Sequence, residues 1–231
     1  MLDTTKKRIA VFDIDGTFFR SSLLIEYNKA LVSAGYIPRR AVRQLLPEYF
    51  AWRDRKGEYN DYLHRVIEMH AAEIKGKSAK DAKVIARRVF NNHKDRVYRY
   101  TRDELARLQK THYTVAISGS PLEMVALFAR YYKFDEYFAT VYEIDRQGNY
   151  TGLIADRRTI GMKGPIVEHL VEDKQLTLRG SWGFGDTGND VSFLQLVENP
   201  VVVNPSSDLY QVARRRKWSV VVERKDMVYE L

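Results

Sequence analysis

Short runs of β-branched and apolar residues alternate with helical patterns along much of the chain, and this alternation limits the fold more than any other feature. An early run, RIAVFD, covers residues 8–13, and later runs cover residues 113–118, 181–186, 200–204 and 218–222. A strand that is apolar along its whole length is typical of a parallel sheet covered by helices on both faces. The sequence therefore predicts an α/β fold with a doubly wound, Rossmann-like parallel sheet.

The first two of these strands are separated by about 90 residues that show only helical patterns. A single crossover helix needs far fewer residues. We therefore expect an inserted helical cap domain of residues 20–100 on an α/β core domain of residues 1–19 and 101–231. The helix that leads into the second strand is expected to begin at a capping box formed by Thr101 and Glu104.

Capping and turn residues indicate where the elements that follow the second strand begin and end. Ser120 and Pro121 are expected to be the N-cap and first residue of a helix. Gly and Asn between alternating residues predict a β-hairpin within residues 138–154. Further helices are expected from about Lys163 to Asp173, and over residues 190–197 and 207–217.

Composition excludes several classes of protein and site. The 231 residues contain no cysteine, which rules out disulfides, thiolate metal sites and cysteine nucleophiles. The net charge of +8 comes from 38 basic and 30 acidic residues, and RRRK at 214–217 is interpreted as one face of a helix. The first apolar run is too short for a signal peptide or a membrane span. We expect a cytoplasmic protein without a nucleic-acid or membrane partner.

The stretch GFGDTGND, residues 183–190, contains the G-x-G-x-x-G pattern of a dinucleotide-binding turn. Such a turn sets the pyrophosphate against backbone N–H groups, where a carboxylate would repel it. Asp186 lies inside this turn, and Asp190 follows four residues later. A metal ion would remove the repulsion, so the stretch is better interpreted as part of a metal site.

Polar side chains from separate segments are expected to meet at one edge of the sheet. The first strand ends in Asp13 and Asp15, the second in Ser118, and a later one in Asp186, while Lys163 opens a helix. Ligands of an open α/β sheet bind at the carboxyl ends of its strands. Several carboxylates in one place need a cation, and oxygen ligands favour Mg²⁺.

In this arrangement DIDGT, the strand-end Ser118, Lys163 and GDTGND resemble the four motifs of the haloacid dehalogenase-like superfamily of phosphatases. The helical insertion after DIDGT resembles the cap of its phosphoserine phosphatase-like branch, subfamily IB. The resemblance implies a phosphatase that forms an aspartyl-phosphate. By the resemblance, Asp13 is the nucleophile and Asp15 is the general acid and base.

The resemblance also assigns the binding residues. Asp13, the backbone carbonyl of Asp15 and Asp186 would bind Mg²⁺, with Asn189 and Asp190 supporting the metal ligands. A second set of residues would hold the oxygens of the transferring phosphoryl group: Ser118, Gly119 and Lys163. Simple chemistry agrees with these roles, because a metal and a lysine reduce the repulsion between a carboxylate and a phosphate dianion.

Each of these residues also has a simpler interpretation. Asp186 and Asp190 could cap the helix that follows, Ser118 could begin a helix, and Lys163 could lie on the surface. The five histidines show no metal-binding spacing and are treated as structural. The aromatic residues are interpreted as packing, although Trp52 or Tyr59 could line the pocket.

The substrate is expected to be a small phosphorylated metabolite. Phosphoserine phosphatases have a glutamate nine residues after the nucleophile, and Ser22 occupies that position here, which argues against phosphoserine. Arg20, Arg53 and Arg55 could instead meet an anionic leaving group. Two other functions stay open: transfer of the phosphoryl group to an organic acceptor, and phosphate binding or protein interaction without catalysis. The oligomeric state is left open as well.

Overall fold

The computed structural model describes residues 6–231, and its centre is one mixed sheet. In the described part of the chain the strand order is β4-β3-β2-β1-β5-β6-β7-β8. The pairs from β3 to β7 are parallel, and β4 and β8 add antiparallel edges. The strands are β1 (Arg8–Asp13), β2 (His112–Pro121), β3 (Glu136–Ile144), β4 (Tyr150–Asp156), β5 (Thr177–Gly185), β6 (Asn199–Val203), β7 (Ser219–Arg224) and β8 (Met227–Glu230).

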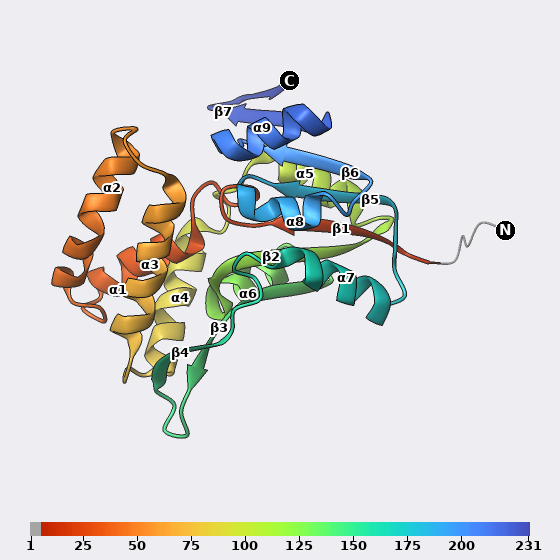
Figure 1. Cartoon of the computed structure of the whole chain (residues 1–231). Coiled ribbons are helices and arrows are strands. Elements are labelled where there is room, and N and C mark those ends of the chain that lie inside the picture. Colours follow the sequence, from red (N-terminus) through yellow and green to blue (C-terminus); the bar gives the residue numbers. More distant parts are fainter. Residues whose placement is uncertain (1–5) are drawn as a thin grey trace.

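Helices cover both faces of this sheet (Figure 1). Successive residues of a strand point to opposite faces, and β1 divides its apolar residues accordingly. Ile9 and Val11 belong to the core beneath α7, α8 and α9, whereas Ala10 and Phe12 belong to the core beneath α5 and α6. The helices are α5 (Arg99–Leu108), α6 (Leu122–Tyr131), α7 (Lys163–Asp173), α8 (Val191–Leu194) and α9 (Ser207–Arg216), with a short 3-10 helix, η2 (Gly188–Asp190). The predicted doubly wound α/β fold is confirmed.

A group of helices lies between β1 and α5 in the sequence and gathers beyond the carboxyl end of β1 (Figure 1). Its members are α1 (Leu23–Ser33), the 3-10 helix η1 (Arg39–Leu45), α2 (Leu46–Arg53), α3 (Tyr59–Ile74) and α4 (Ala79–His93). Local signals set several of their ends: Ser22 caps α1, Ser78 caps α4, and Gly35 follows α1 with φ of 72°. We call this group the cap helices. The domain boundaries stay a prediction, and residues 1–5 of the predicted core lie outside the described residues.

Helix α5 begins two residues before the expected capping box. Its N-cap is Tyr98, and Thr101 lies inside the helix, where its hydroxyl donates to the carbonyl of Thr17 at 3.0 Å. The side chain of Glu223, in β7, accepts the first N–H groups of α5, from Arg99 at 3.1 Å and Tyr100 at 2.9 Å. The prediction was wrong because a distant strand supplies the cap.

Three other expectations also differ from the structure. Ser120 belongs to β2 rather than capping α6, whose N-cap is Pro121. The helix expected over 190–197 is replaced by η2 and the short α8. Strand β8 was not predicted, because its residues are mostly exposed and pair only at the edge of the sheet. Every helix within residues 6–231 is too short or too polar to cross a bilayer.

His70 is a buried titratable group among the cap helices. Its Nδ1 lies 2.9 Å from Oδ1 of Asn28, and because the Asn28 amide group donates to the carbonyl of Leu24, His70 is the donor. Its Nε2 is buried and has no hydrogen-bond partner in residues 6–231. Burial lowers the pKa of His70 to about 3.

We expect His70 to make the fold less stable in acid. The unfolded chain takes up a proton on this imidazole near pH 6.5, whereas the folded chain does not until about pH 3, so stability is lost as pH falls through this window. Between pH 7.5 and 5 this costs about 2 kcal/mol. Urea unfolding of His70→Gln should show a pH dependence smaller by that amount. His64→Gln is the control, because His64 is an exposed residue of the same helix, and an equal change in both variants would contradict the prediction.

Candidate active site

The predicted site residues meet at the carboxyl ends of three neighbouring strands. Asp13 is the last residue of β1, Ser118 lies near the end of β2, and Asp186 follows β5. Lys163 is the first residue of α7. Gly164 allows α7 to pack close to η2 and α8, because the Cβ of any larger residue there would lie 2.6 Å from the carbonyl oxygen of Ser192. The predicted residues therefore lie together at the edge of the sheet where open α/β folds bind ligands.

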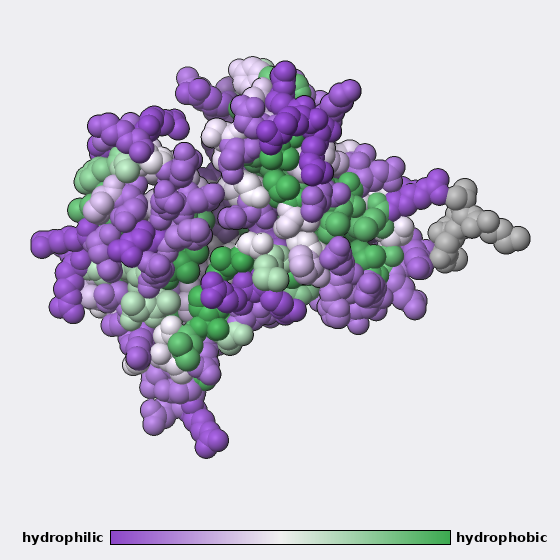
Figure 2. Space-filling model, viewed as in Figure 1, coloured by the Kyte–Doolittle hydropathy of each residue, from purple (hydrophilic) through white to green (hydrophobic). Residues whose placement is uncertain are grey.

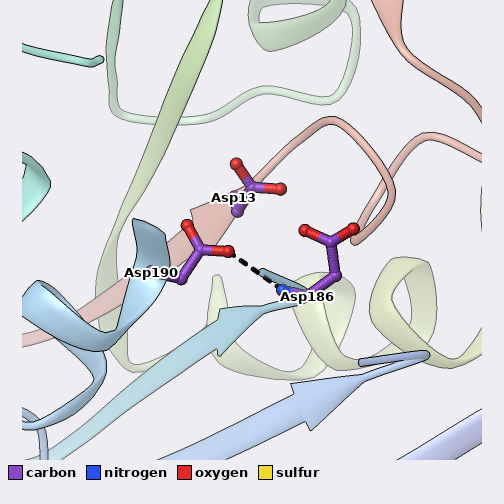
Figure 3. A group of neighbouring side chains, drawn as sticks. All are labelled: Asp13, Asp186 and Asp190. Carbon is purple, nitrogen blue, oxygen red and sulfur yellow. Dashed lines mark hydrogen bonds between the residues drawn. The ribbon is translucent and has the colours of Figure 1, made fainter. Parts of the chain in front are cut away.

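Three carboxylates face a common point (Figure 3). Asp13, Asp186 and Asp190 each offer one oxygen, and these oxygens lie within 4.8 Å of one another. Oδ2 of Asp13 is buried and has no hydrogen-bond partner in the described chain. A buried carboxylate oxygen without a donor, next to two other carboxylates, is the environment that an oxygen-bound divalent cation satisfies.

Lys163 supplies the positive charge of this group. Its Nζ lies 2.5 Å from Oδ1 of Asp13 and 2.6 Å from Oδ1 of Asp190, and all three side chains are buried. Burial alone would lower the pKa of the Lys163 ammonium, but the two carboxylates raise it above its ordinary value. Lys163 is therefore a buried cation and not a surface lysine.

Asp190 is held from both sides. While Oδ1 contacts Lys163, Oδ2 accepts the backbone N–H groups of Asp186 and Thr187, each at 3.0 Å. Asp190 thus caps η2, as the simpler interpretation held, and also orients the loop that carries Asp186. Asn189 is exposed and lines the cavity above the site.

The carboxylate of Asp15 has a different set of partners from that of Asp13. It accepts the N–H of Leu23 at 2.5 Å, the hydroxyl of Ser118 at 2.5 Å and the hydroxyl of Ser120 at 2.9 Å. Burial nevertheless raises the pKa of Asp15, and these hydrogen bonds oppose the rise. Asp15 is thus bound to the start of α1, outside the group of three carboxylates.

Most of the predicted residues line one cavity of about 900 Å³: Asp13, Asp15, Gly119, Lys163, Asp186 and Asn189. Ser118 and Asp190 lie behind that surface, in contact with Asp15 and Lys163. Sequence reasoning missed Ser120, which lines the cavity and binds Asp15. The available signal was its position two residues after Ser118 on an extended strand.

Some of the residues that the sequence proposed as substrate contacts line the cavity, and others do not. Trp52, Tyr59 and Arg20 line the cavity, whereas Arg53 pairs with Asp54 and neither it nor Arg55 belongs to the lining.

A model of the haloacid dehalogenase-like hydrolases matches residues 10–195. The chain belongs to this family. Among curated proteins it is 25% identical to the "Inhibition of morphological differentiation protein" of Streptomyces azureus, covering 92% of this chain and 77% of that protein. It is 22% identical to a histidinol-phosphatase of Neisseria meningitidis, covering 93% and 98%. The family model therefore identifies the protein as a haloacid dehalogenase-like hydrolase.

Solved structures share the fold of this hydrolase. A protein of unknown function from Bordetella pertussis superposes with a TM-score of 0.76 at 21% identity, covering 94% of this chain and 98% of that one. A phosphoserine phosphatase with a phospho-aspartyl intermediate analogue gives a TM-score of 0.64 at 17% identity, covering 96% of both chains. The second likeness shows that the chain shares the fold of a phosphoserine phosphatase.

We expect Gly16→Ala to inactivate the hydrolase by displacing Asp186. Gly16 has φ of 82°, and an added Cβ would lie 2.0 Å from Oδ2 of Asp186. Gly35 has φ of 72° with nothing within 4 Å, so Gly35→Ala brings the backbone strain without the collision. Each variant should lose about 1 kcal/mol of stability from strain. Release of phosphate from nitrophenyl phosphate should fall by at least roughly tenfold in Gly16→Ala alone, and equal losses in both would refute the steric argument.

Proposed function

We propose that the protein is a Mg²⁺-dependent phosphatase that hydrolyses a small phosphomonoester through an aspartyl-phosphate on Asp13. The observation that carries the proposal is the position of this carboxylate. One Asp13 oxygen contacts the buried Lys163 ammonium, and the other is buried without a partner in the described chain, beside Asp186 and Asp190. A carboxylate so placed can attack a phosphorus atom whose negative charge is balanced by neighbouring cations.

The residues present fit a hard divalent cation. Asp13, Asp186 and the backbone carbonyl of Asp15 would hold Mg²⁺, with Asn189 and Asp190 in support, and oxygen ligands alone suit this ion. When bound, Mg²⁺ would offset the charge of the carboxylates and of the phosphoryl oxygens. Burial raises the pKa of Asp13 to about 8, so this carboxyl needs additional positive charge to be ionised at neutral pH.

Asp15 is the proposed general acid and base. In the first step an Asp13 oxygen bonds to phosphorus, the bond from phosphorus to the alcohol oxygen breaks, and Asp15 gives that oxygen a proton. In the second step Asp15 takes a proton from water, the water oxygen bonds to phosphorus, and the bond from phosphorus to the Asp13 oxygen breaks, which restores the Asp13 carboxylate and releases phosphate. The raised pKa of Asp15 suits a group that must hold a proton and then release it.

The phosphoryl oxygens would be held by Lys163 and by the end of β2. Gly119 lines the cavity and presents backbone rather than a side chain. The Ser118 hydroxyl donates to Asp15 and accepts the N–H of Ser120 at 3.0 Å. We therefore propose that Ser118 also positions Asp15, besides the phosphate contact that the resemblance implies.

Residues 20–100 are proposed to act as a cap domain that selects the substrate, and residues 1–19 and 101–231 as the core that carries the chemistry. The position of the glutamate of phosphoserine phosphatases is occupied by Ser22, which is buried and caps α1. Nearby Glu26 contacts Ser21, Lys29 and Arg96 and does not line the cavity. This arrangement supports a substrate other than phosphoserine. A cytoplasmic location stays a prediction.

Asp13→Asn and Asp15→Asn should fail differently. Without its nucleophile, Asp13→Asn should form no phosphoenzyme and show only background turnover. Asp15→Asn loses proton transfer, which is worth roughly 10² to 10⁴ in rate, so it should be slow rather than inactive. With nitrophenyl phosphate, whose leaving group needs little protonation, Asp15→Asn should accumulate phosphoenzyme, seen by mass spectrometry as one phosphoryl group on Asp13. A label on Ser118, or parental rates for Asp13→Asn, would exclude the mechanism.

Removal of Mg²⁺ by a chelator should abolish turnover, and added Mg²⁺ should restore it. Asp186→Asn removes one charged ligand and should need a higher Mg²⁺ concentration for half-maximal rate. Asp103→Asn is the control, because Asp103 is exposed on α5 and does not line the cavity. Full activity in excess chelator would exclude the metal from the mechanism.

A further inference from the structure

The cavity above the carboxylates extends far beyond what a phosphoryl group fills. One face of α1 lines it from Leu24 through Asn28 to Val32, and one face of α3 lines it from Tyr59 to Ile67. Eight residues of helix rise about 12 Å, so the cavity follows α1 and α3 for that distance. The N-terminus of α1 is bound to Asp15, so the far end at Val32 lies a helix length from the chemistry.

Most side chains of the cap helices that line this cavity are apolar or aromatic, and Asn28, Lys29 and His64 are the polar ones. Four rings from α2 and α3 pack together. Trp52 is stacked on Tyr62 with 5.8 Å between the ring centroids, and the centroid of Tyr59 lies 5.2 Å from that of Trp52. Tyr59 lines the same cavity as Asp15 and Asp186, and burial and the charges of these two carboxylates raise its pKa. Further in, the wall consists of aliphatic side chains such as Leu45, Val66 and Met69, each less than 7% exposed.

The charge of the wall favours one type of alcohol. Within residues 6–231 its carboxylates are Asp13, Asp15 and Asp186, all of which belong to the catalytic site. Arg20 and Lys29 add positive charge to the lining. A substrate ammonium placed among the cap helices would have no carboxylate partner there, and it would be desolvated by apolar side chains.

Hydrophobic residues also show from outside where the cap helices meet the core, within a mostly hydrophilic face (Figure 2). Val42 of η1 and Leu46 of α2 line the cavity and are 37% and 38% exposed, so the apolar wall reaches the surface. These two apolar side chains of the wall are therefore accessible from solvent.

We propose that the substrate is the phosphomonoester of an elongated apolar alcohol, whose chain lies between α1 and α3 while its phosphate lies at Asp13. This inference rests on the proposed function and names its substrate class. Each buried methylene group should raise kcat/KM about fourfold, because the apolar surface it removes from water is bound in the transition state as well.

The test compares Mg²⁺-dependent phosphate release from ethyl, butyl and octyl phosphate, each below its micelle-forming concentration, with nitrophenyl phosphate, phosphoserine and histidinol phosphate. We expect kcat/KM for octyl phosphate to exceed that for ethyl phosphate by at least about 100-fold. Equal values for the two alkyl phosphates, or preference for an amino-alcohol phosphate over octyl phosphate, would overturn the inference and leave the proposed function intact. Release from none of these esters would overturn both.

A matched pair of variants tests where the alkyl chain of the substrate lies in the cavity. Val32→Phe fills the far end of the cavity and should lower the ratio of octyl to ethyl kcat/KM by at least about tenfold. Val84→Phe makes the same exchange on α4, outside this cavity and 49% exposed, and should leave the ratio unchanged. An unchanged ratio in Val32→Phe would overturn the placement of the chain along α1.

A binding measurement is independent of turnover. Octyl phosphate titrated into Asp13→Asn should change the tryptophan fluorescence, and the change should disappear when Trp52 is also replaced by Phe, since Trp182 and Trp218 lie outside the cavity. Ethyl phosphate should cause a smaller change at equal concentration. Saturable binding of both esters with equal affinity would count against the inference.

Discussion

The balance of charge around Lys163 is the constraint on which the rest of the site depends. Its ammonium contacts Asp13 and Asp190 within 2.6 Å in a buried setting, and removing either sign of charge would leave the other uncompensated. Close backbone approaches make the contact possible. A Cβ at Gly185 would lie 2.6 Å from that of Asp190, and Gly164 admits η2 and α8 to the start of α7. The parallel order β2-β1-β5 then places the second acidic loop beside Asp13.

A second set of contacts joins the chemistry to the cap helices. The first N–H groups of α1 have no partner within the helix, and Asp15 accepts that of Leu23 while Ser120 accepts that of Leu24 at 3.0 Å. The carboxyl group proposed to carry the proton therefore also holds the first cap helix in place. A shift of α1 would change both the hydrogen bonds of Asp15 and the wall of the cavity, so substrate fit and proton transfer share one element.

The sequence predicted those features that depend on strand order and strand ends. Parallel strands deliver their last residues to one edge, so Asp13, Ser118 and Asp186 could be brought together without knowing any side-chain contact. Features set by contacts between distant segments were not predictable. Glu223 caps α5 from a strand more than 120 residues later, and Ser120 turns from its expected helix to Asp15. The sequence named Trp52 and Tyr59 as possible lining residues, but it did not reveal the length of the cavity, because Val66 looks like an ordinary packing residue until α1 and α3 are in place.

The exclusion of water from the cavity links the apolar wall to the proposed acid, Asp15. Burial is the largest cause of the raised pKa of Asp15, although three hydrogen-bond donors oppose it. Tyr59 lines the same cavity as Asp15 and is close enough for the Asp15 charge to raise its own pKa. An apolar alcohol in the cavity would exclude more water and would strengthen the interactions between Lys163, Asp13 and the phosphoryl oxygens. An alcohol that brings its own water or a cation would weaken them. The lining of the cap helices can therefore act on rate as well as on binding, without any cap residue touching the phosphorus atom.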